Sequence, residues 1–194
     1  MIPRLVLATK NRDKLREMEA VLGDTGLVGE VVQGLDWPDV EETGDTLEAN
    51  ALHKSRVVVA ATGLPAIADD TGLEVSALGG GPGVHSARLA GPEATYEQNV
   101  ALLLDLLTGV NDRSARFRSV VALAFPDGSE ITAEGVLFGA ITREPRGSGG
   151  FGYDPVFLVG DQTLAEMGED LKNLTSHRAI ALRALARELG LPVP

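Results

Sequence analysis

Residues 65–75 read PAIADDTGLEV, and this stretch decides how the middle of the chain folds. Its apolar residues 66–68 are typical of a buried strand, and Asp69 and Asp70 follow them directly. We expect the strand to end at this pair and a turn to follow. An Asx turn and a cation site explain the two carboxylates about equally well. Side chains alternate along a strand, so the carboxylates would point to opposite faces unless the strand ends at Asp69.

Strand signals lie on both sides of this stretch. Runs of apolar and β-branched residues predict strands at residues 4–9 and 27–33, and two longer strands at residues 115–125 and 130–142. The turn PDGS between the two longer runs is typical of a hairpin. The chain therefore contains enough strands for one sheet.

Cap residues predict four helices between and after these strands. A Thr side chain can accept from the free N–H groups of a first turn, and Gly adopts the left-handed conformation that ends a helix. The expected helices are 13–22 closed by Gly23, 47–62 between Thr46 and Gly63, a third opened by the capping box of Thr95 and Gln98, and about 175–189 closed by Gly190 and Pro192.

The composition indicates a folded globular protein. The chain has 194 residues, 44% of them apolar, which is enough to bury one sizeable core, and its mean hydropathy is +0.07. Strands and helices mix without a repeat or linker, so we expect one α/β domain over residues 1–194. No apolar run approaches the roughly 18 residues of a membrane span, and there is no Cys. We therefore expect a cytoplasmic protein without a membrane partner.

The charge balance argues against a nucleic-acid partner. The formal net charge is −11, whereas binding to a phosphate backbone depends on clustered Lys and Arg. A small polyanion needs only a local group of cations, often with a divalent metal. Each Lys is therefore informative, although a compositional bias towards Arg explains their scarcity equally well. The four are Lys10, Lys14, Lys54 and Lys172.

The segment TKNRDK at residues 9–14 lies where the first strand turns into the first helix. Its hydroxyl, amide and ammonium groups suit phosphate oxygens, as do the free N–H groups of a helix N-terminus. The alternative is that Thr9 and Asn11 only cap the helix while Lys14 is solvated. Taken alone, the motif favours that alternative.

Four carboxylates form the second group of candidate site residues. Carboxylates held close together stay ionised only when a cation joins them, and Mg²⁺ takes one or two carboxylates together with water and phosphate oxygens. A solvated acidic loop is the alternative for Glu41 and Glu42. The candidate metal ligands are Glu41, Glu42, Asp69 and Asp70.

Two further motifs lie in the C-terminal half. GSGGFG has the spacing of a dinucleotide-binding loop, but YDPVF follows it instead of a helix, so we expect a closely approached loop that presents Phe151, Tyr153 and Asp154. His177 and Arg178 fall in the first turn of the last expected helix. Cations there oppose the helix dipole unless an anion lies nearby.

Together these segments resemble the inosine triphosphate pyrophosphatase family, also called dITP/XTP pyrophosphatases. The resemblance covers nearly the whole chain, in family order. The matching segments are VLATKNRDKLREM, EETGDTLEANALHK, LPAIADDTGLEVSALGGGPGVHSARLAG, RFRSVVALAF, ITREPRGSGGFGYDPVF and AEMGEDLKNLTSHRAIAL.

The resemblance implies a fold, a reaction and a set of site residues. The fold is an elongated central mixed β-sheet flanked by helices, with a nucleotide cleft between two lobes, usually in a homodimer. The reaction is hydrolysis of the purine nucleoside triphosphates ITP, dITP and XTP to the monophosphate and pyrophosphate, with Mg²⁺. Asp70 matches the catalytic carboxylate. The implied substrate contacts are Thr9, Lys10, Asn11, Lys14, Lys54, Thr71, Phe151, Gly152, Tyr153, Asp154, Lys172, His177 and Arg178.

Two other functions remain alternatives. One is a Maf-type pyrophosphatase that acts on modified pyrimidine or methylated nucleotides. The other is a nucleotide-binding sensor without turnover. The matches around residues 151–154 and 176–178 disfavour the first, and the Asp pair with Lys14 disfavours the second.

Overall fold

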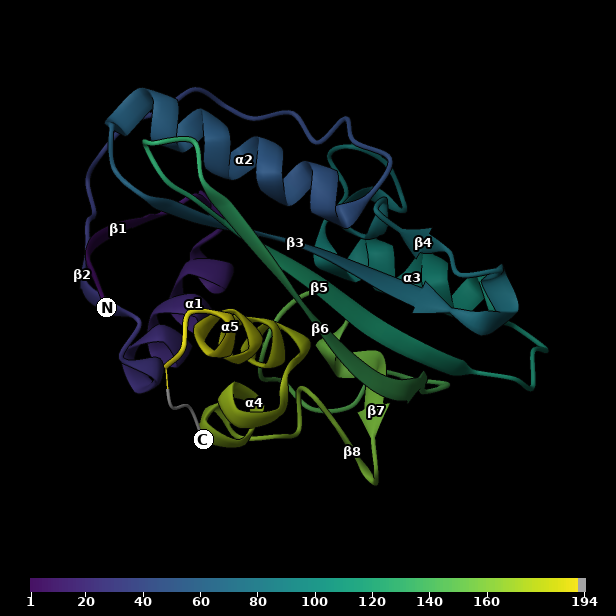
Figure 1. The fold of residues 1–194 in the computed structure, drawn as a ribbon. Coiled ribbons are helices and arrows are strands. Elements are labelled where there is room, and N and C mark those ends of the chain that lie inside the picture. The colour runs from purple at the N-terminus through teal and green to yellow at the C-terminus, as the bar shows by residue number, and fades with distance from the viewer. Residues whose placement is uncertain (192–194) are drawn as a thin grey trace. The chain divides into compact units, whose positions relative to one another are not determined.

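The structure is a computed structural model that describes residues 1–191; Pro192, which we expected to help end the last helix, lies outside them. Strands and helices alternate along the chain (Figure 1). In order, the main elements are β1 (Ile2–Leu7), α1 (Arg12–Thr25), β2 (Val28–Val31), α2 (Leu47–Thr62), β3 (Ala66–Val75), β4 (Pro82–Gly83), α3 (Tyr96–Leu106), β5 (Ser114–Ala124), β6 (Glu130–Ile141), β7 (Phe157–Val159), β8 (Gln162–Thr163), α4 (Glu169–Thr175) and α5 (His177–Glu188).

The described strands form one mixed sheet of eight strands. Its order is β2-β1-β3-β5-β6-β7-β8, and β4 pairs with β3 off this path. β1 pairs in parallel with β2 and β3, whereas β4 is antiparallel to β3, and β7 is antiparallel to β6 and β8. This arrangement, flanked by helices, confirms the expected α/β fold with a mixed sheet.

The chain divides into two compact units. Unit 1 comprises residues 1–70, 119–135 and 177 to the end of the chain, and unit 2 comprises residues 71–118 and 136–176. Three strands, β3, β5 and β6, contribute residues to both units.

Unit 1 has an apolar cluster on each face of its part of the sheet. Leu5 and Leu7 pack into one cluster with residues of α1 and α5, whereas Val6 packs into the other with Val58 of α2. Figure 1 shows α1 and α5 on one side of these strands and α2 on the other. In β3, Ile67 belongs to the first cluster and Ala66 and Ala68 to the second. Because side chains alternate along a strand, successive residues of β1 and of β3 point to opposite faces of the sheet.

Unit 2 has its own core around β3, α3 and β5. Leu73 and Val75 pack there with Leu103, and the rings of Phe117 and Phe157 lie 4.5 Å apart. This core explains why our expectation that the strand ends at the Asp pair is wrong. The strand continues to Val75 because its second half is buried and pairs with β4.

Helix boundaries that depend on caps were predicted well, with two exceptions. The Thr46 cap, the left-handed Gly63 and the capping box of Thr95 are present as expected. However, α1 runs past Gly23 to Thr25, and its C-cap is Gly26, whose φ is 63°. The expected helix at 175–189 is present as α5, which begins at His177 and is followed by the left-handed Gly190, but the separate helix α4 before it was not expected.

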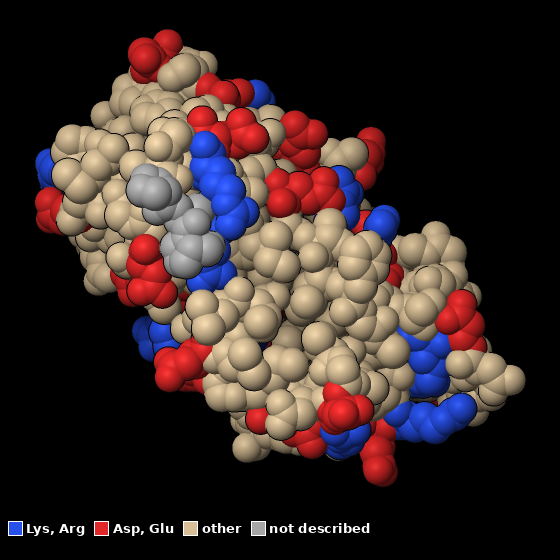
Figure 2. Space-filling model, turned by 60° about the horizontal axis from the view of Figure 1, so that its bottom comes forward, with Lys and Arg blue, Asp and Glu red and all other residues tan. Residues whose placement is uncertain are grey.

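The surface carries both signs of charge. On the face drawn in Figure 2, the Lys and Arg side chains lie in small groups beside Asp and Glu side chains. In the described part of the chain, none of the helices is long and apolar enough to cross a membrane.

Candidate functional site

Asp69 lies at the centre of a buried charge group in unit 1. Its Oδ2 is 3.1 Å from the Lys14 ammonium and accepts from Nε and Nη2 of Arg178 at 3.1 and 3.0 Å. Arg178 also donates from Nη1 to Glu17 Oε2. The Arg178 side chain is only 2% exposed and that of Asp69 is fully buried. Burial raises the pKa of Asp69, but the charges of Arg178 and Lys14 outweigh it and hold this pKa well below its usual range.

Asp70 lies on the opposite face of β3, against α2. Its Oδ1 accepts from the Lys54 ammonium at 3.2 Å, and its Oδ2 accepts from Asn50 Nδ2 at 3.0 Å. Lys54 also donates to Glu42 Oε1 at 2.7 Å. Burial raises the pKa of Asp70; the Lys54 charge opposes this shift and the Glu42 charge adds to it, so the pKa stands above its usual value. One ammonium is thus shared by two carboxylates.

The two lysines differ in how well their charge is compensated. Burial lowers the pKa of Lys14, and the nearby Asp69 does not fully offset the effect. Burial also lowers the pKa of Lys54, but the charges of Asp70 and Asp69 outweigh it, so this pKa is raised. Lys54 therefore keeps its proton more readily than Lys14 does.

The TKNRDK segment has the helix cap that we weighed for it, whereas its phosphate contacts stay a prediction. Asn11 is the N-cap of α1 and accepts from the N–H groups of Asp13 and Lys14 at 2.9 and 3.2 Å. Thr9 Oγ1 accepts from the Asn11 N–H at 3.2 Å. The Lys14 side chain, however, is only 18% exposed, so it is not simply solvated. Lys10 points elsewhere: it is half exposed and pairs with Asp39 at 2.5 Å.

The structure separates the neighbouring residues Glu41 and Glu42. Glu42 contacts Lys54, whereas Glu41 is exposed. Among residues 1–191, no three His, Asp or Glu side chains lie close enough to hold a metal by themselves. The donor set of Glu42 and Asp70 still fits Mg²⁺, which needs only one or two carboxylates when water and phosphate oxygens complete its shell.

Unit 2 contains a second charged group, around Asp154. Its Oδ2 accepts from the Lys172 ammonium at 2.6 Å and from the Phe151 N–H at 2.8 Å, and the same ammonium lies 4.8 Å from the centre of the Phe151 ring. The loop depends on Gly150, where φ is 69° and a Cβ would lie 2.1 Å from Asp154 Oδ2.

The aromatic side chains of this group have separate environments. Tyr153 is buried and its hydroxyl donates to the Ser86 carbonyl at 2.8 Å; burial raises its pKa. Phe151 is half-buried, and its ring centroid is 5.9 Å from that of Tyr96. Phe151 therefore remains the aromatic face in this group that a base could reach.

Three further predicted residues lie in different parts of the fold. Thr71 is half-buried in β3 directly after Asp70, Gly152 adopts φ 63° in the loop, and His177 is 5% exposed at the start of α5. Their substrate contacts stay predictions.

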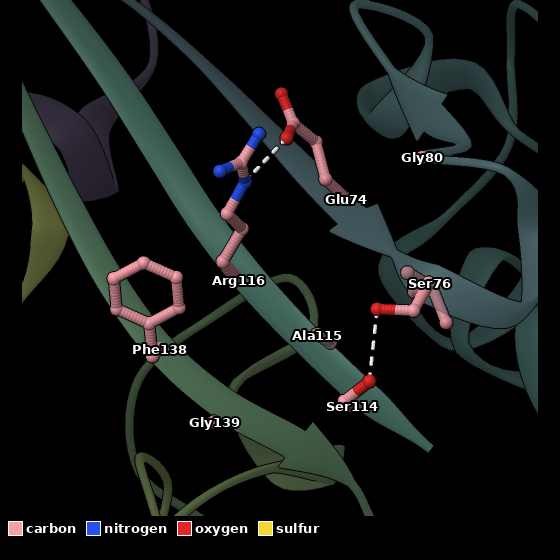
Figure 3. A pocket seen from close by; sticks show the side chains of 9 residues that line it. Glu74, Ser76, Gly80, Ser114, Ala115, Arg116, Phe138 and Gly139 are labelled. Atoms are coloured by element: carbon pink, nitrogen blue, oxygen red, sulfur yellow. Dashed lines mark hydrogen bonds and ion pairs between the residues drawn. The ribbon is translucent and has the colours of Figure 1, made fainter. Parts of the chain in front are cut away.

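A pocket of about 570 Å³ lies elsewhere in unit 2 (Figure 3). In Figure 3, Arg116 of β5 reaches Glu74 of β3, and Ser114 donates to Ser76. Its lining does not include any residue that the sequence predicted for the site.

Sequence reasoning missed two polar residues of unit 1, Glu17 and Asn50. A signal for both was present in the helical spacing. Glu17 lies three residues after Lys14 on α1, and Asn50 lies four residues before Lys54 on α2, so each shares a face with a predicted residue.

Known structures define the class of this protein. The HAM1 protein from Coxiella burnetii is 41% identical, with a TM-score of 0.84 over 97% of this chain and 99% of that chain. A nucleoside-triphosphatase/dITP/XTP pyrophosphatase from Mycobacterium abscessus is 42% identical, with a TM-score of 0.75 over 96% and 99%. The protein is thus a HAM1-like α/β protein.

Sequence comparison then gives the family. The Ham1 family model matches residues 5–188, so this chain belongs to the Ham1 family. The dITP/XTP pyrophosphatase of Symbiobacterium thermophilum is 51% identical over 189 residues, which cover 95% of this chain and 92% of the relative. That of Geobacter sulfurreducens is 48% identical over 192 residues, 96% of both. The family expected from the sequence motifs is confirmed.

Proposed function

We propose that this chain hydrolyses the non-standard purine nucleoside triphosphates ITP, dITP and XTP to the nucleoside monophosphate and pyrophosphate. Its close relatives carry the name dITP/XTP pyrophosphatase. The observation that carries the proposal is the sharing of Lys54 by Asp70 and Glu42, on the face of β3 opposite the Asp69–Lys14 pair. These residues stand on the motif positions that the family comparison covers.

The cations of unit 1 provide the first requirement of the reaction. A triphosphate repels an attacking hydroxide, so catalysis of this type depends on positioning and charge compensation. Lys14 and Lys54 are the cations that we assign to the phosphates. Lys14 lies in the first turn of α1, where the positive end of the helix dipole also favours phosphate oxygens.

Asp70 provides the second requirement, a base for the attacking water. A carboxylate with a raised pKa accepts a proton more readily than an ordinary one, and the pKa of Asp70 is raised. We assign it the proton of the water that attacks the α-phosphorus. The bond between the α-phosphorus and the bridging oxygen breaks, and pyrophosphate leaves with that oxygen. Asp69 is better suited to hold Lys14, because its own pKa is lowered.

Glu42 and Asp70 are the residues that would hold Mg²⁺. A bound Mg²⁺ would supply further compensation of the phosphate charge. The ligands expected from the sequence also included Glu41 and Asp69. Exposure of Glu41 and the Lys14 and Arg178 contacts of Asp69 favour the smaller set.

Selection of the base is the third requirement. Hypoxanthine and xanthine present a carbonyl where adenine presents an amino group, so a site made of donors would leave buried donors unpaired with adenine. Backbone N–H groups of residues 149–154 are the donors that we propose. The Arg178 guanidinium, which the sequence also suggested, is buried in unit 1 and already donates to Asp69 and Glu17. Stacking on Phe151 would add roughly 1–3 kcal/mol without choosing between bases.

One assay tests this function. The purified protein is given a panel of nucleoside triphosphates with and without Mg²⁺, and the phosphate product is identified. Pyrophosphate from ITP and XTP, with much slower turnover of ATP, is the expected result. A preference for modified pyrimidine or methylated nucleotides would support a Maf-type enzyme, and binding without turnover would support a sensor; either would refute the proposal.

The expected homodimer and cytoplasmic location complete the proposal. The homodimer comes from the family resemblance, and the cytoplasmic location is the expectation from the sequence composition. Light scattering tests the first and cell fractionation the second.

A further inference from the structure

Asn50 is a buried amide of α2 that joins two segments of the charged site in unit 1. It is 2% exposed. Its Nδ2 donates to Asp70 Oδ2 at 3.0 Å, and its Oδ1 accepts from the Gly44 N–H at 2.8 Å. One side chain therefore links β3 to the loop that carries Glu42.

On the strand side, Asn50 determines how the Asp70 carboxylate is turned. Rotation about the last side-chain bond of an Asp is broad, so the neighbours choose its orientation. Asn50 binds Oδ2, and Lys54, one helical turn further along α2, binds Oδ1 at 3.2 Å. Each oxygen thus has a different partner from the same helix face.

On the loop side, the contact leaves no room for a side chain at Gly44. A Cβ on Gly44 would lie 2.7 Å from Asn50 Oδ1, well inside contact distance, and 3.0 Å from the Cβ of Ala49. Two residues earlier, Glu42 accepts from Lys54 at 2.7 Å. The loop is therefore attached to α2 at two points.

We infer that Asn50 is a positioning residue, which sets the separation and orientation of Glu42 and Asp70 around Lys54 through its bonds to Gly44 and Asp70. This inference rests on the proposed function for its effect on turnover. The link between Asn50 and the loop does not depend on that function and can be measured separately.

Unit 2 provides a matched control. Asn99 is 3% exposed; its Oδ1 accepts from the Ala90 N–H at 2.9 Å and its Nδ2 donates to the Ala87 carbonyl at 3.0 Å. The substitutions Asn50→Ala and Asn99→Ala therefore remove the same buried amide with two hydrogen bonds. Only the first removes a contact with a carboxylate.

The first readout is hydrogen exchange at the Gly44 amide, without metal or nucleotide. In Asn50→Ala this amide loses its acceptor, so we expect exchange at least about 10-fold faster than in wild type, as for local opening. Asn99→Ala should leave it unchanged. Unchanged exchange in Asn50→Ala, or equal acceleration in both variants, would overturn the inference.

The second readout is steady-state turnover of ITP. Because misplacement of a reacting group mainly affects the transition state, kcat of Asn50→Ala should fall about 10- to 100-fold, with KM changed less than about 3-fold. Asn99→Ala should keep both constants within about 2-fold. A matching fall in kcat for Asn99→Ala would show a general stability effect and refute positioning. A wild-type protein without turnover would refute the proposed function, and the exchange readout would still decide the link.

A third variant, Gly44→Ala, keeps the Asn50 side chain and disturbs its contact with the loop at residue 44. Gly44→Ala should lower kcat in the wild-type background, because the new Cβ meets Asn50 Oδ1. It should lower kcat by a smaller factor in the Asn50→Ala background, where that oxygen is gone and only the contact with the Ala49 Cβ remains. Effects that simply multiply would overturn the inference. If Asn50→Ala does not fold, as judged by circular dichroism, loss of kcat with retained KM in Gly44→Ala supports the inference and wild-type kcat overturns it.

Discussion

The two faces of β3 at Asp69 and Asp70 place adjacent carboxylates in opposite electrostatic surroundings. Asp69 faces α1 and α5 and is held between Lys14 and Arg178, so its pKa is lowered. Asp70 faces α2 and shares Lys54 with Glu42, so its pKa is raised. One strand can thus place a carboxylate with a lowered pKa beside one with a raised pKa, because alternation gives each a separate environment.

The largest expected effect comes from removing the proton acceptor. Asp70→Asn should lower kcat for ITP by at least about 10³-fold, because an amide does not take up a proton at neutral pH. Nucleotide binding, measured by calorimetry, should remain detectable, since Lys14 and Lys54 are still present. Asp24→Asn, an exposed position on α1, is the control and should behave as wild type. Near-normal turnover by the Asp70→Asn variant would contradict the assignment of Asp70 as the proton acceptor.

Removing the anchor should affect stability more than chemistry. Asp69→Asn leaves the buried Arg178 and Lys14 without their carboxylate, which should cost about 3–5 kcal/mol of unfolding free energy at pH 7. The pKa of Asp69 is lowered by folding, so its contribution is present above the unfolded-state pKa of about 3.9 and is lost as pH falls through the folded-state pKa. Urea unfolding should therefore show a difference from wild type that shrinks below about pH 4.

The control for this prediction is Asp39→Asn. Asp39 is an exposed carboxylate paired with Lys10, and such surface pairs contribute about 0–1 kcal/mol. Equal losses for Asp39→Asn and Asp69→Asn would mean that the buried pairing around Asp69 is not what stabilises unit 1.

The sequence predicted several helix ends, but not the continuation of β3 through Asp69 and Asp70. Local signals predicted the Thr46 and Gly63 caps and the Thr95 capping box, because a few neighbouring residues determine them. The continuation of β3 past Asp70 depends on pairing with β4 and on burial in the core of unit 2, which no local pattern contains.

The sequence also did not predict which side chains the candidate site residues contact. Arg178 is 109 residues from Asp69, and its buried pairing with that carboxylate and Glu17 was not foreseen. The family resemblance had suggested a contact with the base for Arg178. Lys14 was a candidate from its place after the first strand, but the motif alone favoured a solvated side chain, and the pairing with Asp69 shows that it is not. Its contact with phosphate stays a prediction.

Removing the cation on the Asp70 side should have the next largest effect on turnover. Lys54→Met keeps a long side chain without charge and should lower kcat/KM at pH 7 about 100-fold, as loss of a preorganised cation does. The Lys54 charge lowers the pKa of Asp70 against burial, so its removal should raise that pKa further. The acid limb of the pH profile of kcat/KM should therefore move to higher pH. Lys10→Met, at a half-exposed Lys, should move neither.

The smallest expected effect separates Glu42 from Glu41. Glu42 lies 2.7 Å from the ammonium that Asp70 shares, whereas Glu41 is exposed, so only Glu42 belongs to the Asp70 side of the comparison. Glu42→Gln should raise the Mg²⁺ concentration for half-maximal pyrophosphate release by about 10-fold. Loss of a residue that only supports a metal ligand already weakens metal binding by about 10-fold or more, so loss of a ligand should do at least as much. Glu41→Gln, which removes the same charge one residue away, should shift it less than about 2-fold. Equal shifts would mean that the loop acts through its net charge, and a larger shift for Glu41→Gln would move the metal ligand to that residue.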